Sequence, residues 1–277
     1  MLKSGWIGYI RGEDFWQKAE QLAQLGYRGM DSDCSALPGE GGPAEKARRL
    51  RAMGVEPLTV SIGFDPEKGL KSEEALARII DSAHAQGIDR VTLWGGSAIQ
   101  SFSRGYGNNG SYEELMADAD AMNYAIPKLA AEGLTLCYHN HYQEFTVCHR
   151  NLTSMDLLLA NTDGRLMLDL DAGWITVAGL DPVGVMARLA GRIAVVHLKD
   201  IYDVEACKRM GGNTAQEDDK GFTALGSGLL DVTGVCAEAD CQGIGYCVVE
   251  QDRLRHLDTM QALTMARYRM FETGLFE

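Results

Sequence analysis

Two histidines and a glutamate lie close together in the segment YHNHYQEF, residues 138–145. One residue separates His139 from His141, and Glu144 follows three positions after His141. Imidazole titrates near neutral pH and can take or give a proton, and both imidazole and carboxylate groups bind divalent metal ions. The segment therefore predicts acid–base chemistry or metal binding.

Similar polar side chains end other apolar runs of the sequence. They are Asp31 and Asp33, Trp94, Asp169 and Asp171, His197 with Lys199 and Asp200, and Glu250. Side chains two residues apart in a strand share one face, so each closely spaced pair is expected to point the same way. Buried charge is costly unless it is paired or bound to metal. The four consecutive runs that end in His139 and His141, Asp169 and Asp171, His197, and Glu250 are therefore expected to form one constellation.

The spacing predicts a site for one divalent cation. The expected ligands are Glu144, Asp171, His197 and Glu250. Three oxygen donors and one nitrogen suit Mn²⁺ best, with Mg²⁺, Co²⁺ and Zn²⁺ as alternatives. A histidine ligand usually donates its other ring N–H to a neighbour, and Asp169 or Asp200 is expected to accept it.

The remaining polar residues suggest roles around that ion. His141 or His139 is expected to act as the general base, and Glu250 is an alternative base. Lys199 is expected to hold a substrate oxygen. Trp94 is expected either to stack on the substrate or to fill the interior of the barrel that is predicted below. Asp31 is expected either to bind a substrate hydroxyl or to cap the next helix.

A repeated pattern predicts the scaffold that positions these residues. A helical run ends, a glycine follows, and an apolar run begins, at Gly26, Gly54, Gly87, Gly133, Gly164, Gly191 and Gly243. Together with a first strand near residues 4–9, these junctions predict eight parallel strands and a (β/α)8 barrel. A doubly wound sheet is the alternative, but its usual glycine-rich phosphate loop after the first strand is absent. We expect one domain, residues 1–277, with segments 101–110 and 201–228 over the catalytic face.

Composition narrows the range of partners. The net charge is −13, which disfavours a nucleic-acid substrate. No apolar run is long enough to span a membrane, and no signal peptide is recognisable, so we expect a cytoplasmic protein. The seven cysteines form no CxxC motif and are expected to be reduced thiols.

The motifs, taken in order, resemble the sugar phosphate isomerase/epimerase family of xylose isomerase-like barrels. They are FWQKAEQLAQLGYRGMD at 15–31, YHNHYQEF at 138–145, LDLDAGW at 168–174, GRIAVVHLKD at 191–200, FTALGSGLLD at 222–231 and VVEQD at 248–252. The resemblance implies a metal site of Glu, Asp, His and Glu from strands five to eight. Asp171, His197 and Glu250 match that pattern. Many relatives carry a glutamate where this chain has His139, so the fourth ligand is either His139 or Glu144, and Glu144 is preferred.

The resemblance also implies an activity. Ketose 3-epimerases and inosose dehydratases are members of the superfamily, so we expect an isomerase or epimerase that removes a proton next to the carbonyl of a sugar. Dehydration of a cyclitol or 3-keto-glycoside at the same site is the alternative. Barrels of this family often form homo-oligomers. The sequence favours two further functions less: a phosphodiesterase of the endonuclease IV type, which would bind several metal ions, and a non-catalytic subunit, which would bind none.

Overall fold

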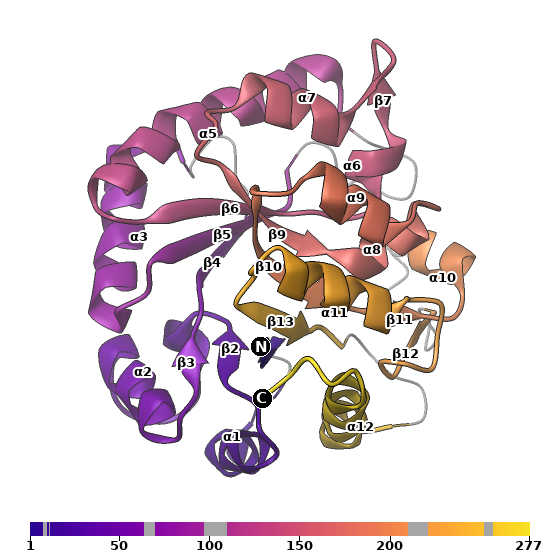
Figure 1. Cartoon of the computed structure of the whole chain (residues 1–277). Helices are drawn as coiled ribbons and strands as arrows, with labels where there is room; N and C mark the ends of the chain where they lie inside the picture. The colour runs from indigo at the N-terminus through magenta and orange to yellow at the C-terminus, as the bar shows by residue number, and fades with distance from the viewer. Residues whose placement is uncertain (8–9, 11, 64–69, 97–109, 210–220, 252–256) are drawn as a thin grey trace.

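Nine parallel strand segments form one continuous curled sheet in the computed structural model, which describes residues 1–7, 10, 12–63, 70–96, 110–209, 221–251 and 257–277 (Figure 1). The segments are β1 (Lys3–Ile7), β2 (Gly29–Asp31), β3 (Glu56–Pro57), β4 (Val60–Gly63), β5 (Arg90–Trp94), β6 (Thr135–His139), β9 (Met167–Asp171), β10 (Ile193–Leu198) and β13 (Tyr246–Val249). Two small antiparallel pairs lie outside this sheet: β7 (Cys148–His149) with β8 (Leu152–Thr153), and β11 (Asp200–Ile201) with β12 (Phe222–Thr223).

Helices surround the sheet (Figure 1). They are α1 (Phe15–Gln24), the short 3₁₀ helix Cys34–Ala36, α2 (Pro43–Ala52), α3 (Glu73–Gln86), α5 (Tyr112–Ala131), α6 (Gln143–Thr146), α7 (Ser154–Asn161), α8 (Ala172–Val177), α9 (Pro182–Arg188), α10 (Val204–Lys208), α11 (Val232–Cys241) and α12 (Thr259–Glu272). Among the described residues, no helix has both the length and the apolar composition needed to cross a bilayer.

Residues 56–63, which contain both β3 and β4, close the sheet into a ring. The sheet order is β3-β2-β1-β13-β10-β9-β6-β5-β4, and its two end segments, β3 and β4, are separated in the chain only by Leu58 and Thr59. β3 pairs with β2 and β4 pairs with β5. Residues 56–63 therefore form one interrupted strand that joins both edges. This arrangement confirms the predicted (β/α)8 barrel, whereas the single-domain assignment stays a prediction.

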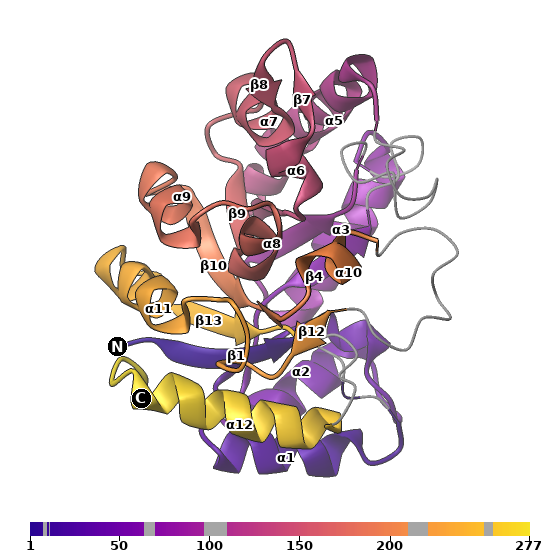
Figure 2. The ribbon, with the colours of Figure 1, turned by 90° about the vertical axis from the view of Figure 1, so that its right-hand side faces the viewer.

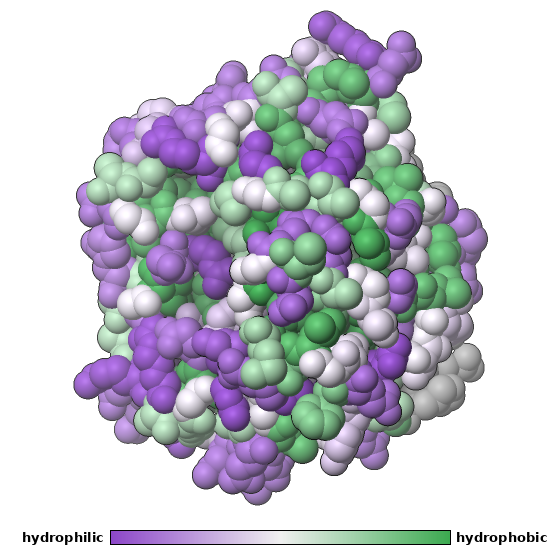
Figure 3. Space-filling model, in the orientation of Figure 1, coloured by the Kyte–Doolittle hydropathy of each residue, from purple (hydrophilic) through white to green (hydrophobic). Residues whose placement is uncertain are grey.

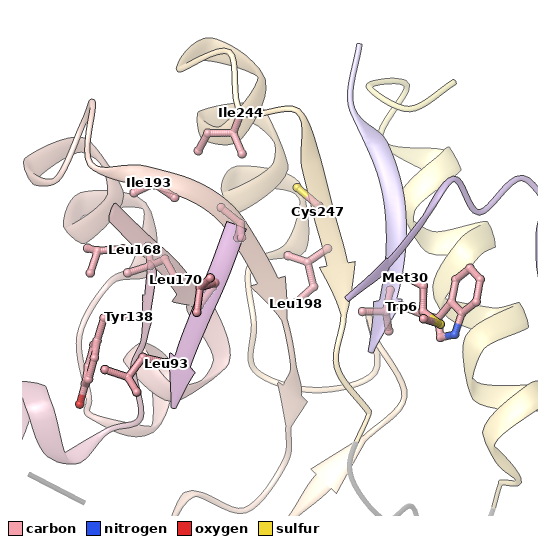
Figure 4. Packing of buried hydrophobic residues seen from close by; sticks show 14 of the residues in the cluster. Trp6, Met30, Leu93, Tyr138, Leu168, Leu170, Ile193, Leu198, Ile244 and Cys247 are labelled. Carbon is pink, nitrogen blue, oxygen red and sulfur yellow. The ribbon is translucent and has the colours of Figure 1, made fainter. Parts of the chain in front are cut away.

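The pleat separates two kinds of core. Residues such as Tyr138, Leu168 and Leu170 point outward and pack between the strands and the helices (Figure 4). A small second cluster fills the inside of the ring, with Val195 and Val248 at its centre. His197 and Glu250 come two residues after these valines, so they lie on the same inner face, one layer further along. The polar strand ends therefore rest on a layer of buried apolar side chains.

The described parts of the long insertion after β10 lie at one end of the barrel. In Figure 2, α10 and β12 are found at the end toward which the arrow of β1 points, which is the end that carries catalytic groups in barrels of this type. Segment 101–109 and residues 210–220 fall outside the described residues. On the face turned to the viewer in Figure 1, hydrophilic residues cover much of the surface, with smaller apolar areas between them (Figure 3).

The predicted glycine junctions are confirmed at all but one position. Glycines such as Gly87, which ends α3 with φ 64°, adopt the left-handed conformation that closes a last helical turn. Gly164 is the exception, because it is not among the glycines with positive φ. Helix α7 ends earlier, at Asn161, and its capping residue Thr162 is extended. The turn at Gly164 therefore does not need a glycine.

Close packing of α8 on β10 gives a test of how the scaffold supports the strand end. A Cβ atom on Gly173 would overlap the carbonyl oxygen of Lys199 and lie 2.8 Å from the Lys199 Cβ. Gly173→Ala is therefore expected to reduce the free energy of unfolding by about 1–3 kcal/mol, measured by urea denaturation. Gly164→Ala is the matched control, because nothing lies within 4 Å of the added methyl group. Equal stability of the two variants would contradict this packing.

Candidate functional site

Four buried side chains meet inside the barrel at the ends of neighbouring strands. His139, Asp171, His197 and Glu250 each offer one ligand atom, and these atoms lie within 4.8 Å of one another. They come from β6, β9, β10 and the residue after β13, which are consecutive in the sheet. The register pairs His139 with Asp169 and His197 with Asp171. We call these four residues the strand-end cluster.

Asp171 presents one carboxylate oxygen to this cluster. Its Oδ1 accepts a hydrogen bond from the backbone N–H of Trp174 at 2.9 Å, which caps helix α8. Its Oδ2 is buried and has no hydrogen-bond partner, and the Lys199 Nζ lies 3.6 Å away. Burial raises the pKa of Asp171, the positive charge of Lys199 opposes this, and the charge of Glu250 adds to it. A buried carboxylate oxygen without a hydrogen-bond partner is suited to bind a cation.

Glu250 contacts both His197 and Lys199, which lies beside the cluster. Its Oε2 lies 2.8 Å from the His197 Nδ1 and 3.8 Å from the His139 Nε2, and its Oε1 accepts a hydrogen bond from the Lys199 Nζ at 2.8 Å. Burial alone would raise the pKa of Glu250. Lys199 and His197 outweigh burial and hold the pKa of Glu250 well below its usual value. Glu250 is therefore ionised.

His197 is held by carboxylates on both of its ring nitrogens. Its Nε2 lies 2.7 Å from the Asp31 Oδ2 and 2.9 Å from the Asp169 Oδ1, whereas its Nδ1 faces Glu250. Burial would lower the pKa of His197, but Asp169, Asp31 and Glu250 together raise it well above the usual value. These contacts fix the orientation of the ring and leave the Nδ1 directed toward the cluster.

This arrangement decides which acidic residues support His197. Asp169 forms an ion pair with the imidazole through its Oδ1, whereas Asp31 accepts the hydrogen bond from Nε2, and the Asp169 Oδ2 accepts a hydrogen bond from the Thr92 hydroxyl at 3.1 Å. Asp200 does not contact it, because its carboxylate accepts backbone N–H groups of residues 201, 226, 228 and 230. Asp31, expected to bind substrate or to cap a helix, is buried with its Oδ2 against His197, and Asp33 caps the following 3₁₀ helix instead.

Glu144 lies outside the strand-end cluster. Its Oε1 accepts a hydrogen bond from the Tyr138 hydroxyl at 2.7 Å, and its Oε2 accepts one from the backbone N–H of His141 at 2.9 Å. Tyr138 and His139 are consecutive in β6, so their side chains point to opposite faces of the sheet, and Glu144 binds the Tyr138 hydroxyl on the outer face. Burial raises the pKa of Glu144 to about 7, although both hydrogen bonds oppose the shift. The expectation that Glu144 joins the other three ligands is therefore not met by the geometry.

The two histidines of the opening motif lie side by side. Their ring centroids are 5.2 Å apart, and the His139 ring is also 4.8 Å from that of His197. Burial lowers the pKa of His139 to about 4. Burial, followed by the charges of His139 and Lys199, lowers the pKa of His141 well below its usual value. Both rings are thus neutral at neutral pH and can accept a proton or bind a metal ion.

Aromatic rings form one wall beside the cluster. The Lys199 Nζ lies 4.6 Å from the Trp174 ring centroid and 5.4 Å from that of Phe222. The Trp174 ring is also 5.3 Å from the His141 ring. Phe222 was not predicted, because it lies in the polar insertion after β10 and no strand pattern marks it. Trp94, predicted to contact substrate or plug the barrel, is 51% exposed and therefore does not plug it.

Known proteins resemble this chain in sequence. Residues 19–268 match the family described as xylose isomerase-like TIM barrel. An inosose dehydratase of Clostridium perfringens is 26% identical over 249 residues, which cover 86% of this chain and 82% of the relative. Inosose dehydratase 2 of Bacillus cereus is 31% identical over 148 residues, half of this chain.

Solved structures share the fold across nearly the whole chain. The probable 3-DHS dehydratase AsbF of Bacillus anthracis has a TM-score of 0.73 at 15% identity and covers 98% of this chain and 99% of its own. An L-ribulose 3-epimerase has a TM-score of 0.69 at 17% identity, covering 99% and 95%. The IolI protein, solved with a zinc atom, has a TM-score of 0.69 at 13% identity, covering 98% of each chain. With a family match over most of its length and its polar groups at the strand ends of a closed barrel, this chain belongs to the xylose isomerase-like TIM barrel family.

Proposed function

We propose that this chain is a metal-dependent lyase that dehydrates a polyhydroxylated cyclic ketone of the inosose type. The observation that carries the proposal is the strand-end cluster, in which an unsatisfied Asp171 oxygen faces His139, His197 and Glu250. The inosose dehydratases that align with 86% of the chain support the substrate class.

The donor atoms of the cluster determine which metal ions it can accept. With His139 in place of Glu144, the proposed ligands are two imidazole nitrogens and two carboxylate oxygens. Mn²⁺, Zn²⁺ and Co²⁺ accept such mixed sets, whereas Mg²⁺ prefers oxygen donors. We keep Mn²⁺ as the first ion to test and Zn²⁺ as the second, because the IolI protein was solved with zinc. A divalent ion at this position would polarise a carbonyl and stabilise negative charge on its oxygen.

The residues around the cluster supply the other steps. Lys199, beside Glu250 and Asp171, is placed to hold a substrate oxygen through its ammonium group. His141 is neutral and takes the proton next to the carbonyl, and the electrons of that C–H bond form a C=C bond as the β-hydroxyl departs. His141 then returns the proton to that hydroxyl, so water leaves and the imidazole is restored. Trp174 and Phe222 exclude bulk water from one side.

Epimerisation is the second candidate. It needs groups that exchange protons on both faces of one carbon. His141 follows β6 and Glu250 follows β13, and the charge of Lys199 lowers the pKa of both groups. The resemblance to an L-ribulose 3-epimerase concerns the fold. The two candidates share proton abstraction and differ in whether a hydroxyl group leaves.

Turnover is expected to depend on Glu250 and His197. With Mn²⁺ and an inosose, Glu250→Gln and His197→Ala should each lose at least about a thousandfold in kcat/KM, since each removes a cluster ligand. Product absorbance and solvent deuterium incorporation measured by mass spectrometry separate dehydration from simple exchange. Glu272→Gln, at an exposed position of α12, is the control. Near-normal turnover by either cluster variant, with an intact circular dichroism spectrum, would refute the site.

Metal affinity is expected to distinguish His139 from Glu144. His139→Ala should weaken Mn²⁺ binding by about 10–100-fold, measured by calorimetry on protein first stripped with a chelator. Glu144→Gln should bind Mn²⁺ like the wild type, because both of its oxygens already bond to Tyr138 and His141. The reverse order of affinities would assign the ligand to Glu144.

The burial of Glu144 is expected to make the stability of the folded protein depend on pH. The pKa of Glu144 is near 7 in the folded chain and lower in the unfolded chain. At a pH between these two values, Glu144 is protonated in the folded chain and ionised in the unfolded chain. The free energy of unfolding of the metal-free protein should therefore fall as pH rises from 5 to 8. Glu144→Gln should remove up to about 3 kcal/mol of that fall, measured by urea denaturation at several pH values. An unchanged slope would show that Glu144 does not titrate in this range.

A further inference from the structure

The side chain of Asn140 continues the hydrogen bonding between β6 and β9 beyond the last backbone pair. The ladder between β6 and β9 ends at the pair His139 and Asp169. One residue later, the Asn140 Oδ1 accepts a hydrogen bond from the backbone N–H of Asp171 at 2.9 Å, and its Nδ2 donates one to the carbonyl of Asp171 at 3.2 Å. The side-chain amide thus occupies the place of a peptide group.

Both groups that Asn140 satisfies belong to one residue of the strand-end cluster. With its backbone held by Asn140 and its Oδ1 held by the N–H of Trp174, Asp171 has little freedom left except at Oδ2. Asn140 is completely buried, so water does not compete for these bonds. Asn140 also directly follows His139, so one side chain ties two members of the cluster together.

We propose that Asn140 is a positioning residue that fixes the Asp171 Oδ2 relative to the His139 ring, so that the two can bind the same cation. This role rests on the proposed metal site. Groups that orient ligands without touching the metal typically change affinity by about 10–100-fold when they are removed. The purely structural alternative is that Asn140 only satisfies two buried backbone groups.

The chain contains a matched control for that alternative. Asn123, in α5, makes the same kind of clamp, because its Nδ2 donates to the carbonyl of Asn161 at 2.7 Å and its Oδ1 accepts from the N–H of Asp163 at 2.7 Å. This second clamp joins α5 to the end of α7 and includes no member of the strand-end cluster. Asn123→Ala therefore removes two side-chain to backbone hydrogen bonds of the same type, at a partly exposed position, without touching the site.

The test compares Mn²⁺ affinity and stability in both variants. We expect Asn140→Ala to weaken Mn²⁺ binding by about 10–100-fold in calorimetry and to change the visible absorption spectrum of the Co²⁺-loaded protein. Asn123→Ala is expected to lower the melting temperature but to keep the wild-type affinity and spectrum. A folded Asn140→Ala variant with wild-type affinity and spectrum would overturn the proposal.

A second variant covers the case in which Asn140→Ala does not fold. Asn140→Asp keeps the acceptor for the Asp171 N–H and places an oxygen against the Asp171 carbonyl, so it should also weaken Mn²⁺ binding; wild-type affinity would overturn the role. Two further measurements test the proposed metal site itself. If the wild-type chain binds no Mn²⁺, or if Asp171→Asn binds it equally well, the proposed function falls and the role of Asn140 falls with it.

Discussion

The imidazole of His197, buried between three carboxylates, is the interaction on which the site depends. Glu250 faces its Nδ1, and Asp31 and Asp169 face its Nε2. Charges in such a dry place are tolerated only when they are paired with good geometry, and removing one partner leaves the others uncompensated. The raised pKa of His197 means that the ring carries a positive charge here. A metal ion bound at Nδ1 would replace a proton, while Asp31 and Asp169 would continue to hold the opposite edge of the ring.

The strand register gives this interaction its precision. β9, β10 and β13 are neighbours, and His197 pairs with Asp171 on one side and with Val248 on the other. Because the pleat repeats every two residues, His197 and Glu250 follow Val195 and Val248 onto the inner face of the sheet. Distances between the cluster side chains are thus consequences of the barrel. The covering wall comes from outside this sheet, with Trp174 in α8 and Phe222 in β12.

The periodicity of the sequence predicts which residues lie at the strand ends, but it does not predict the turns that follow the strands or contacts between distant residues. The strand-end positions of Asp171, His197 and Glu250 follow from counting strands and applying the pleat, and the structure brings these three together. The place of Glu144 depends on the turn after β6, where the Tyr138 hydroxyl draws the carboxylate to the outer face of the sheet. The burial of Asp31 against His197 spans 166 positions in the chain, and no local pattern contains such a contact.

The histidine at position 139 changes the charge of the proposed ligand layer. Asp171 and Glu250 together balance a divalent ion, and His139 adds no charge because burial lowers its pKa to about 4. Lys199 then contributes one positive charge beside them. A carboxylate at position 139 would cancel that charge. The layer therefore favours a substrate oxygen that becomes negative as the neighbouring proton leaves, which is the step shared by dehydration and epimerisation. The two reactions differ in whether a hydroxyl group leaves after that step, and the charge of the ligand layer does not decide this.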